Sequence, residues 1–290
     1  MIRIRVNRRT FLGTMGAAVM SARYAAADSI RDIGVQLYTV RADLAKDFEG
    51  TIAKVAAIGF KEVEFAGYFN HTPEQVSGVL KKNGLTSPAA HADYANLGDK
   101  WPGVLDAARA IGHQYLVNPW IDEAIRNQPD SWKRIADVFN RAGELSKKAG
   151  IQFAYHNHNF EFAPVEGKLP YDILLERCDP ALVKMELDLC WIVVAGKDPL
   201  EYFRRYPGRF PLVHVKGLSK RPPSDAGAAP IPEVLKDITD VGSNDIIDWK
   251  RIFARSAEAG IKHYIVEHDV PKAPFDSLKT SYTYLRGLRF

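Results

Sequence analysis

The chain has 290 residues, 46% of them hydrophobic, which is enough for one large core. Its formal charge of +4 arises in the first 27 residues, which hold five arginines and no acid, while the rest of the chain carries 34 basic and 35 acidic side chains. This balance argues against a nucleic-acid-binding protein, and no apolar run in the body of the chain is long enough to span a bilayer.

The first 27 residues have the three parts of an export signal: a charged start, a weakly apolar middle, and an A-x-A cleavage site at 25–27. The pair Arg8-Arg9 stands directly before the letters TFL, which resembles a twin-arginine signal. We therefore expect residues 1–27 to be a twin-arginine signal peptide and residues 28–290 to be the exported domain. The twin-arginine export machinery would carry it, already folded, to the periplasm, with no membrane attachment after cleavage. A plain amphipathic start to the domain is the alternative.

Short strand-like runs alternate with helical patterns through the rest of the chain. The eight candidate strands span 33–40, 62–66, 87–92, 115–120, 151–158, 183–189, 210–217 and 263–269. Between them, apolar residues recur at three- and four-residue spacing, and glycines at 59, 84, 112, 150 and 260 stand where a helix C-cap favours a left-handed residue. Eight such units predict a single-domain (β/α)8 TIM barrel. A doubly wound sheet competes less well, because no G-x-G-x-x-G follows an early strand.

The longest non-periodic stretch, residues 218–247, lies between the seventh and eighth candidate strands. Loops of this length in compact domains are functional or lack order. Its position above the C-terminal face of the barrel favours a lid.

Ligand-type side chains gather at the ends of the last four strands. They are His156, His158 and Glu161 after strand five, Glu186 and Asp188 on strand six, His214 and Lys216 on strand seven, and Glu267 and Asp269 on strand eight. Barrel enzymes place their chemistry at the C-terminal ends of the strands, so these side chains are expected to converge. Weaker candidates for the same mouth, for which packing is the simpler explanation, are Glu64, His91, Asn118, Trp120 and Trp191.

Carboxylates with imidazole and no thiolate form a hard-to-borderline donor set. Such a set suits one divalent metal ion: Mn²⁺, Mg²⁺, Co²⁺ or Zn²⁺. A divalent ion can hold a sugar carbonyl and its neighbouring hydroxyl and stabilise an enediolate, while a nearby carboxylate or histidine moves the proton. The alternative is that these groups are ion pairs that lock the top of the barrel.

The strand ends resemble those of the xylose isomerase-like TIM barrels, a family of sugar phosphate isomerases/epimerases whose relatives include inosose dehydratase and endonuclease IV. The resemblance covers roughly residues 30–290. It implies one divalent metal held by Glu, Asp, His and Glu from strands five to eight. In this sequence Asp188 in MELDLCW, His214 in LVHVKG and Glu267 in YIVEHD match the last three ligands.

The fifth strand departs from the family pattern, because YHNHNFEF stands where the epimerases have a glutamate within the strand. Glu161 is the favoured fourth ligand, since it restores a set of three carboxylates and one histidine, and His156 is the second choice. His156 and His158 then become candidates for proton transfer. Lys216 lies on the strand face of His214, where an ammonium stabilises negative charge on the substrate.

These features predict a metal-dependent sugar isomerase or epimerase of carbohydrate metabolism that enolises its substrate. A dehydratase or lyase acting on a keto-sugar, keto-glycoside or inosose is the close alternative. Export argues against a cytosolic sugar phosphate as the substrate. A nuclease would need a basic groove, which the charge balance does not offer. A periplasmic sugar-binding protein without catalysis is the alternative from another class.

Overall fold

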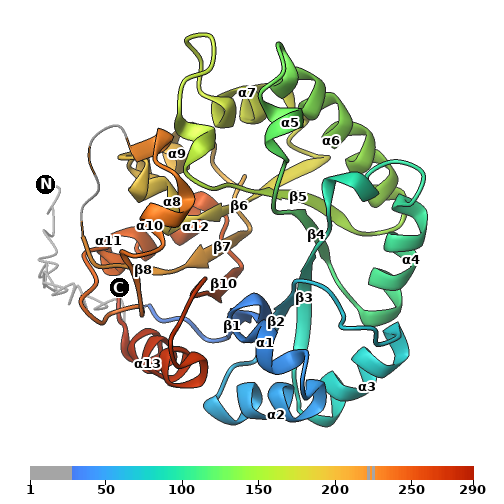
Figure 1. The fold of residues 1–290 in the computed structure, drawn as a ribbon, viewed down its shortest axis with the longest axis vertical. Coiled ribbons are helices and arrows are strands. Elements are labelled where there is room, and N and C mark those ends of the chain that lie inside the picture. The colour runs from blue at the N-terminus through green and yellow to red at the C-terminus, as the bar shows by residue number, and fades with distance from the viewer. Residues whose placement is uncertain (1–27, 221–222, 224–225) are drawn as a thin grey trace, which may run out of the picture.

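Eight parallel strands close into a barrel at the centre of the protein, as the computed structural model of residues 28–220, 223 and 226–290 shows (Figure 1). In chain order they are β1 (Ile33–Gln36), β2 (Glu62–Phe65), β3 (Thr86–His91), β4 (Tyr115–Asn118), β5 (Gln152–His156), β6 (Val183–Asp188), β7 (Leu212–Val215) and β10 (His263–Val266). Each strand pairs with its neighbours in sequence, and β10 closes the ring against β1. The predicted single (β/α)8 barrel is confirmed. The expected signal peptide, residues 1–27, lies outside the described residues.

Helices surround this barrel on its outer face (Figure 1). The longer ones are α2 (Phe48–Ile58), α3 (Pro73–Lys82), α4 (Trp101–Ile111), α6 (Ser131–Lys148), α7 (Pro170–Arg177), α9 (Pro199–Arg205) and α13 (Pro274–Gly287). Short helices are α1 (Arg41–Leu44), α5 (Glu123–Arg126), α8 (Leu189–Val194), α10 (Ile231–Val234), α11 (Trp249–Phe253) and α12 (Ser256–Ala259). No helix of the described residues is long and apolar enough to cross a membrane.

The helices follow from the apolar spacing of the sequence. In α6, Trp132, Ile135 and Phe139 recur at three- and four-residue intervals, and all three are buried against the barrel. The five glycines expected at helix ends all have positive φ. Gly112 and Gly260 adopt the left-handed conformation, and their N–H groups close the last turns of α4 and α12.

Hydrophobic residues fill two separate spaces. One large cluster lies between the strands and the helices, and a smaller one fills the inside of the barrel with Ala89, Tyr115, Val117, Ala154, Leu212 and Ile265. The barrel is therefore a packed core rather than a pore, as is usual for this architecture. Polar side chains lie on either side of this inner layer: Glu62 and His263 pair at the N-terminal ends of the strands, and a larger polar cluster lies at the C-terminal ends.

The first strand is shorter than the sequence pattern suggested. The Gln36 side chain accepts a hydrogen bond from the N–H of Tyr38 at 3.0 Å, and the chain turns there into the 3-10 helix η1 (Leu37–Val40). Strand pairing stops at Gln36 because the following residues have left the extended conformation.

The segment predicted to be a lid contains a small hairpin of β8 (Gly217–Leu218) and β9 (Ile238–Thr239). A Cβ atom on Gly217 would lie 2.6 Å from the carbonyl oxygen of Asp240, so a glycine is needed where the two strands meet. The described part of this segment contributes Ile231 and Leu235 to the pocket above the barrel. Its position agrees with the predicted lid, although lid motion stays a prediction.

Candidate functional site

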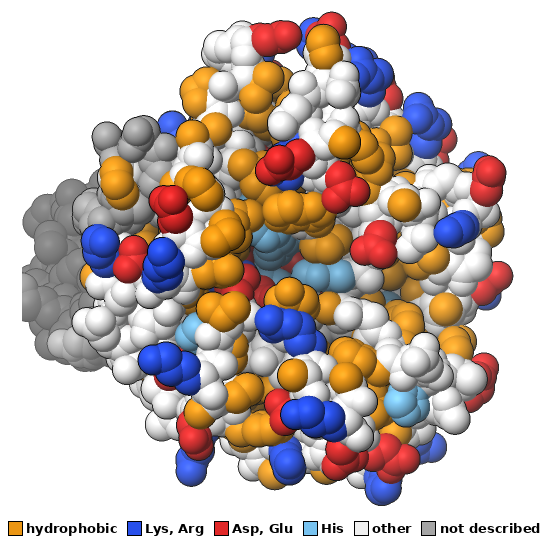
Figure 2. Space-filling model, in the orientation of Figure 1, with side chains coloured by type: hydrophobic (Ala, Val, Ile, Leu, Met, Phe, Trp, Pro, Cys, Tyr) orange, Lys and Arg blue, Asp and Glu red, His pale blue; other side chains and the backbone are white. Residues whose placement is uncertain are grey.

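A pocket of about 650 Å³ opens at the C-terminal end of the barrel. Figure 2 shows it as a hollow in which histidine and carboxylate side chains are visible beneath a mostly hydrophobic rim. Of the predicted site residues, His156, His158, Lys216 and Glu267 line the pocket. Asp188 and His214 are fully buried in the layer beneath.

Strand register brings three of the expected ligands together. Asp188 on β6 pairs in register with His214 on β7, and Glu267 follows β10, the neighbour of β7. The His214 Nδ1 atom lies 2.8 Å from Glu267 Oε2 and 4.0 Å from Asp188 Oδ2. Potential ligand atoms of these three residues all lie within 4.8 Å of one another. This spacing lets them share one ion.

His156 is the fourth residue at this position. Its Nε2 atom lies 3.8 Å from Asp188 Oδ2, and its ring is 4.5 Å from the His214 ring, centroid to centroid. Burial and the charge on His214 lower the pKa of His156 to about 3, so its imidazole is neutral and has a lone pair for a cation.

Asp188 has one oxygen committed to the fold and one available. Its Oδ1 atom accepts hydrogen bonds from the N–H groups of Cys190 and Trp191 and caps α8. Its buried Oδ2 accepts no hydrogen bond from the described residues, and the nearest of the cationic or imidazole nitrogens around it is Lys216 Nζ, which forms an ion pair at 3.2 Å. A buried oxygen in this state, next to imidazole and carboxylate donors, fits a divalent cation.

Glu186 lies beneath these donors and contacts three imidazoles at once. Its Oε2 atom is 3.1 Å from His156 Nδ1, 3.2 Å from His214 Nε2 and 3.3 Å from His91 Nε2. Burial raises the pKa of Glu186, but His214 and the hydrogen bonds outweigh burial and hold it well below its ordinary value. The carboxylate is therefore charged, and the ring nitrogens that face it carry hydrogens. In His156 this tautomer leaves Nε2, with its lone pair, directed toward Asp188. In His214, burial lowers the pKa, but Glu186 and the carboxylate hydrogen bonds outweigh burial and raise it well above its ordinary value. Both ring nitrogens of His214 therefore carry hydrogens, and a cation would replace the hydrogen on Nδ1.

The sequence alone did not predict a specific role in this cluster for Glu186, Glu64 or His91. Glu64 Oε2 lies 2.7 Å from His214 Nε2 and accepts a hydrogen bond from Gln36 at 2.9 Å. Sequence spacing could have indicated that Glu186 belongs to the cluster. It precedes Asp188 by two residues, which puts both on the inner face of β6. His91 and Glu64 end β3 and β2 on the opposite side of the barrel, where the family resemblance implied no ligand.

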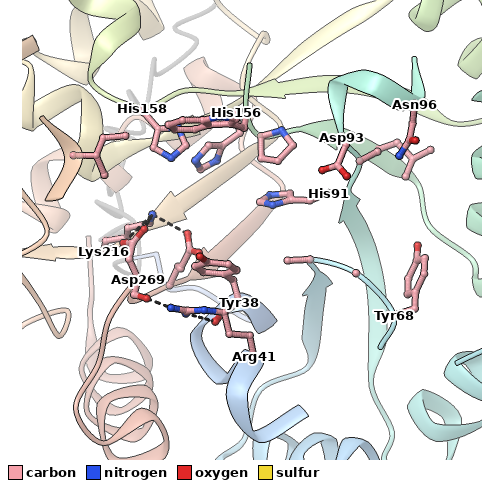
Figure 3. Close-up of a pocket in the computed structure, with 18 of the residues that line it drawn as sticks. Tyr38, Arg41, Tyr68, His91, Asp93, Asn96, His156, His158, Lys216 and Asp269 are labelled. Atoms are coloured by element: carbon pink, nitrogen blue, oxygen red, sulfur yellow. Dashed lines mark hydrogen bonds and ion pairs between the residues drawn. The ribbon is translucent and has the colours of Figure 1, made fainter. Parts of the chain in front are cut away.

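Lys216 is a buried ammonium surrounded by carboxylates. Its Nζ atom lies 2.8 Å from Glu267 Oε2 and 3.2 Å from both Asp188 Oδ2 and Asp269 Oδ1. Burial lowers the pKa of Lys216, but these carboxylates outweigh burial and raise it well above its ordinary value. Lys216 is therefore a fixed positive charge at the pocket wall (Figure 3) and is unsuited to giving up a proton.

Glu161 is not among the residues that converge, contrary to the expectation that it is the fourth ligand. The chain turns after β5 into the 3-10 helix η3 (Phe160–Phe162), which buries Glu161 completely. One carboxylate oxygen accepts from the Tyr155 hydroxyl at 2.5 Å, and the other accepts from the N–H of His158 at 2.9 Å. Glu161 thus fixes the backbone of the loop that presents His158.

His158 projects from this loop into the pocket (Figure 3). Its ring is stacked on Phe160 at 5.6 Å and meets the edge of Trp120 at 5.1 Å. Burial and neighbouring His156 lower the pKa of His158 well below its ordinary value. A neutral imidazole held in one orientation has a lone pair ready to accept a proton, and its lowered pKa makes it a weaker base than a free histidine.

Burial of Glu161 gives a prediction about pH. Burial raises its pKa to about 7 in the folded protein, against 4.5 for a free side chain, although the Tyr155 hydrogen bond opposes the shift. The folded state then binds more protons than the unfolded state between these values, so stability falls as the pH rises through them. Glu161→Gln cannot ionise, and we expect it to gain roughly 2–3 kcal/mol relative to the wild type between about pH 5 and pH 8.

Chemical denaturation at both pH values measures this difference. The exposed Glu144→Gln serves as the matched control and should show no such gain. An unchanged difference between Glu161→Gln and the wild type across this range would contradict the predicted titration.

Comparisons with known proteins agree with the barrel fold. The family model described as "Xylose isomerase-like TIM barrel" matches residues 52–288. An inosose dehydratase of Lacticaseibacillus casei is 28% identical over 267 residues, which cover 82% of this chain and 88% of that protein. The crystal structure of a sugar phosphate isomerase/epimerase from Parabacteroides distasonis superimposes with a TM-score of 0.74 at 25% identity, covering 92% of this chain and 96% of that one. The structure of the IOLI protein with a bound zinc atom shares the fold, with a TM-score of 0.67 at 14% identity over 87% of this chain and 96% of that one.

Proposed function

Since this chain belongs to the xylose isomerase-like TIM barrel family, we propose that it is a divalent-metal-dependent enzyme that enolises a carbohydrate next to its carbonyl group. The observation that supports this most is that Asp188, His214 and Glu267 offer ligand atoms within 4.8 Å of one another at an open pocket, with His156 Nε2 3.8 Å from Asp188 Oδ2. The proposed metal ligands are His156, Asp188, His214 and Glu267. Glu161, the first choice from the sequence, is replaced by His156 because its carboxylate is bonded elsewhere.

A divalent ion at this position would polarise the substrate carbonyl and make the neighbouring C–H group more acidic. His158 is the proposed base that accepts this proton, because it is neutral and faces the pocket. The Lys216 ammonium stabilises the negative charge that develops on the substrate oxygen. His156, proposed from the sequence as a second proton carrier, is instead a ligand in this proposal.

Isomerisation and dehydration both begin with this proton transfer, and we favour dehydration of a keto-sugar, keto-glycoside or inosose. Inverting a carbon centre requires proton carriers on both faces of the substrate. Eliminating water requires a single proton carrier, which takes the proton from carbon and returns it to the departing hydroxyl so that water leaves. Among the imidazoles close to the proposed ligands, His158 is the one whose ring forms no ion pair with a carboxylate of the described residues. The similarity to an inosose dehydratase supports the same choice.

Incubating metal-loaded protein with inososes, free ketoses and keto-glycosides in D₂O tests this proposal. We expect loss of one water molecule from a keto substrate, and no loss after chelation of the metal. Deuterium retained in an otherwise intact sugar would instead support the isomerase or epimerase first predicted from the sequence. Bound sugar with stoichiometric metal, but neither product nor exchange, would contradict enzymatic function and favour a binding protein.

Export stays part of the proposal, because the twin-arginine pattern of residues 1–27 motivates it. Cell fractionation of a double Arg8→Lys, Arg9→Lys variant tests it. Mature variant protein in the periplasm would contradict the twin-arginine route.

A further inference from the structure

We propose that the pocket has a second carbohydrate subsite, and that the substrate therefore carries a second sugar ring joined to the ring that reacts. This proposal rests on the proposed function, because the reacting ring is placed at the histidine and carboxylate cluster. The subsite is the part of the pocket that we call the outer lobe, lined by Ala66, Gly67, Tyr68, Asp93, Asn96 and Val104.

The outer lobe lies to one side of the proposed metal ligands. In Figure 3, Tyr68, Asp93 and Asn96 are on one side of His91, and His158, Lys216 and Asp269 are on the other. The whole pocket, about 650 Å³, falls within the roughly 300–1,000 Å³ typical of sites for drug-sized ligands. A single hexose is much smaller than such ligands, so a sugar ring at the cluster leaves the outer lobe to be filled.

Tyr68 gives the outer lobe a fixed aromatic wall. Burial lowers the pKa of His113 to about 4, so its imidazole is neutral. Its Nδ1–H group donates to the Ser87 carbonyl at 2.9 Å, so its Nε2 atom accepts from the Tyr68 hydroxyl at 3.0 Å. The Tyr68 ring also packs against Phe65 at 5.4 Å. Because its hydroxyl and its ring are both already held, Tyr68 can pack against the C–H face of a sugar without a further loss of side-chain conformational entropy.

Asp93 and Asn96 supply the polar groups. Asp93 is exposed and Asn96 is partly buried, and Figure 3 places them across the outer lobe from Tyr68. A carboxylate accepts two hydrogen bonds from neighbouring hydroxyls, and an amide both donates and accepts. The outer lobe has no lysine or arginine among its described lining residues, since Arg41 and Lys216 lie on the other side of the pocket. This chemistry favours an uncharged polyhydroxyl group over a phosphate.

Equilibrium binding separates this proposal from the proposed reaction, because it needs no turnover. Glucose, maltose, cellobiose, sucrose, trehalose and phenyl glucoside are titrated into metal-loaded protein by calorimetry. We expect at least one disaccharide to bind about tenfold or more tightly than glucose. Asn96→Ala and Tyr68→Ala should remove that gain, whereas Tyr68→Phe, which keeps the ring, should retain most of it. Asn127→Ala, an exposed position outside the pocket, is the matched control and should retain all of it.

Equal affinity for glucose and every disaccharide would overturn the second subsite, even if the enzyme proves to be a dehydratase. A gain that survives both alanine variants would overturn its location in the outer lobe. Tighter binding of phenyl glucoside alone would mean that the outer lobe takes an apolar group, and would also overturn the proposal. Disaccharide binding without any turnover would leave the subsite standing and contradict the proposed reaction instead.

Discussion

Asp188→Asn is expected to lower the affinity for a divalent metal by more than about 100-fold, while leaving the fold intact. The amide oxygen can still accept from the N–H groups of Cys190 and Trp191, so the cap of α8 survives. The new NH₂ group takes the place of Oδ2 and presents hydrogens to the cation position. Loss of one ligand should exceed the roughly 10–100-fold loss typical of groups that orient ligands.

Metal content after dialysis against buffered Zn²⁺ and Mn²⁺, measured by mass spectrometry, checks this result. Glu186→Gln should lower the affinity by about 10–100-fold, because it disturbs the tautomers of His156 and His214 without removing a donor. His156→Gln should behave like Asp188→Asn, and Glu161→Gln should keep its metal. Wild-type metal content in Asp188→Asn would remove the basis for the site. Metal loss in Glu161→Gln, with retention in His156→Gln, would restore the ligand set first predicted from the sequence.

Much of the fold could be predicted because its signals are local. Apolar periodicity and glycine C-caps identified the strand–helix units, and strand polarity identified the end of the barrel where the polar residues meet. The first strand was predicted too long, because the turn at Gln36 depends on its own side chain capping the backbone of Tyr38. β-branched and aromatic residues after Gln36 gave no sign of that bond.

The site was less predictable because it depends on where a loop turns. Glu161 and His156 are both ligand-type residues in YHNHNFEF, and the ligand set implied by the family resemblance favoured the carboxylate. The turn at η3 directs Glu161 to Tyr155, whereas His156 is still part of β5 and takes its direction from the strand. A strand fixes side-chain direction by its alternation, and a loop does not, so the direction of His156 was the more predictable of the two.

The role of Glu186 was also hidden, since its partners come from three strands. His91, His156 and His214 are far apart in the sequence, and only barrel closure brings them around one carboxylate oxygen. Register explains one contact, because His156 pairs with Glu186 across β5 and β6. The contact with His214 is to the other neighbouring strand, β7, two residues beyond Leu212, the register partner of Glu186. Only His91, on β3, reaches Glu186 across the barrel interior, where sequence spacing carries no information.

His158→Gln is expected to lower turnover by roughly 10²–10⁴-fold while leaving metal content unchanged. Glutamine keeps a similar size and can still lie against Phe160, but it cannot accept a proton at working pH. The N–H hydrogen bond to Glu161 is a backbone contact, so the loop should hold its position in the variant. The effect should therefore fall on kcat more than on KM.

The pH profile distinguishes a base from a residue that only shapes the pocket. Because burial holds the pKa of His158 well below its ordinary value, this imidazole stays neutral as the pH falls through the range in which a free histidine titrates. Wild-type turnover should thus persist at pH values where an exposed histidine base would already be protonated, and the variant should lose turnover by the same factor across that range. The matched control is His71→Gln. The His71 ring is stacked against Phe48 outside the pocket, so this variant should leave turnover unchanged. If His158→Gln kept wild-type turnover, another group at the pocket wall would have to accept the proton. Glu267 would be the first to test, because it is the proposed ligand carboxylate that lines the pocket.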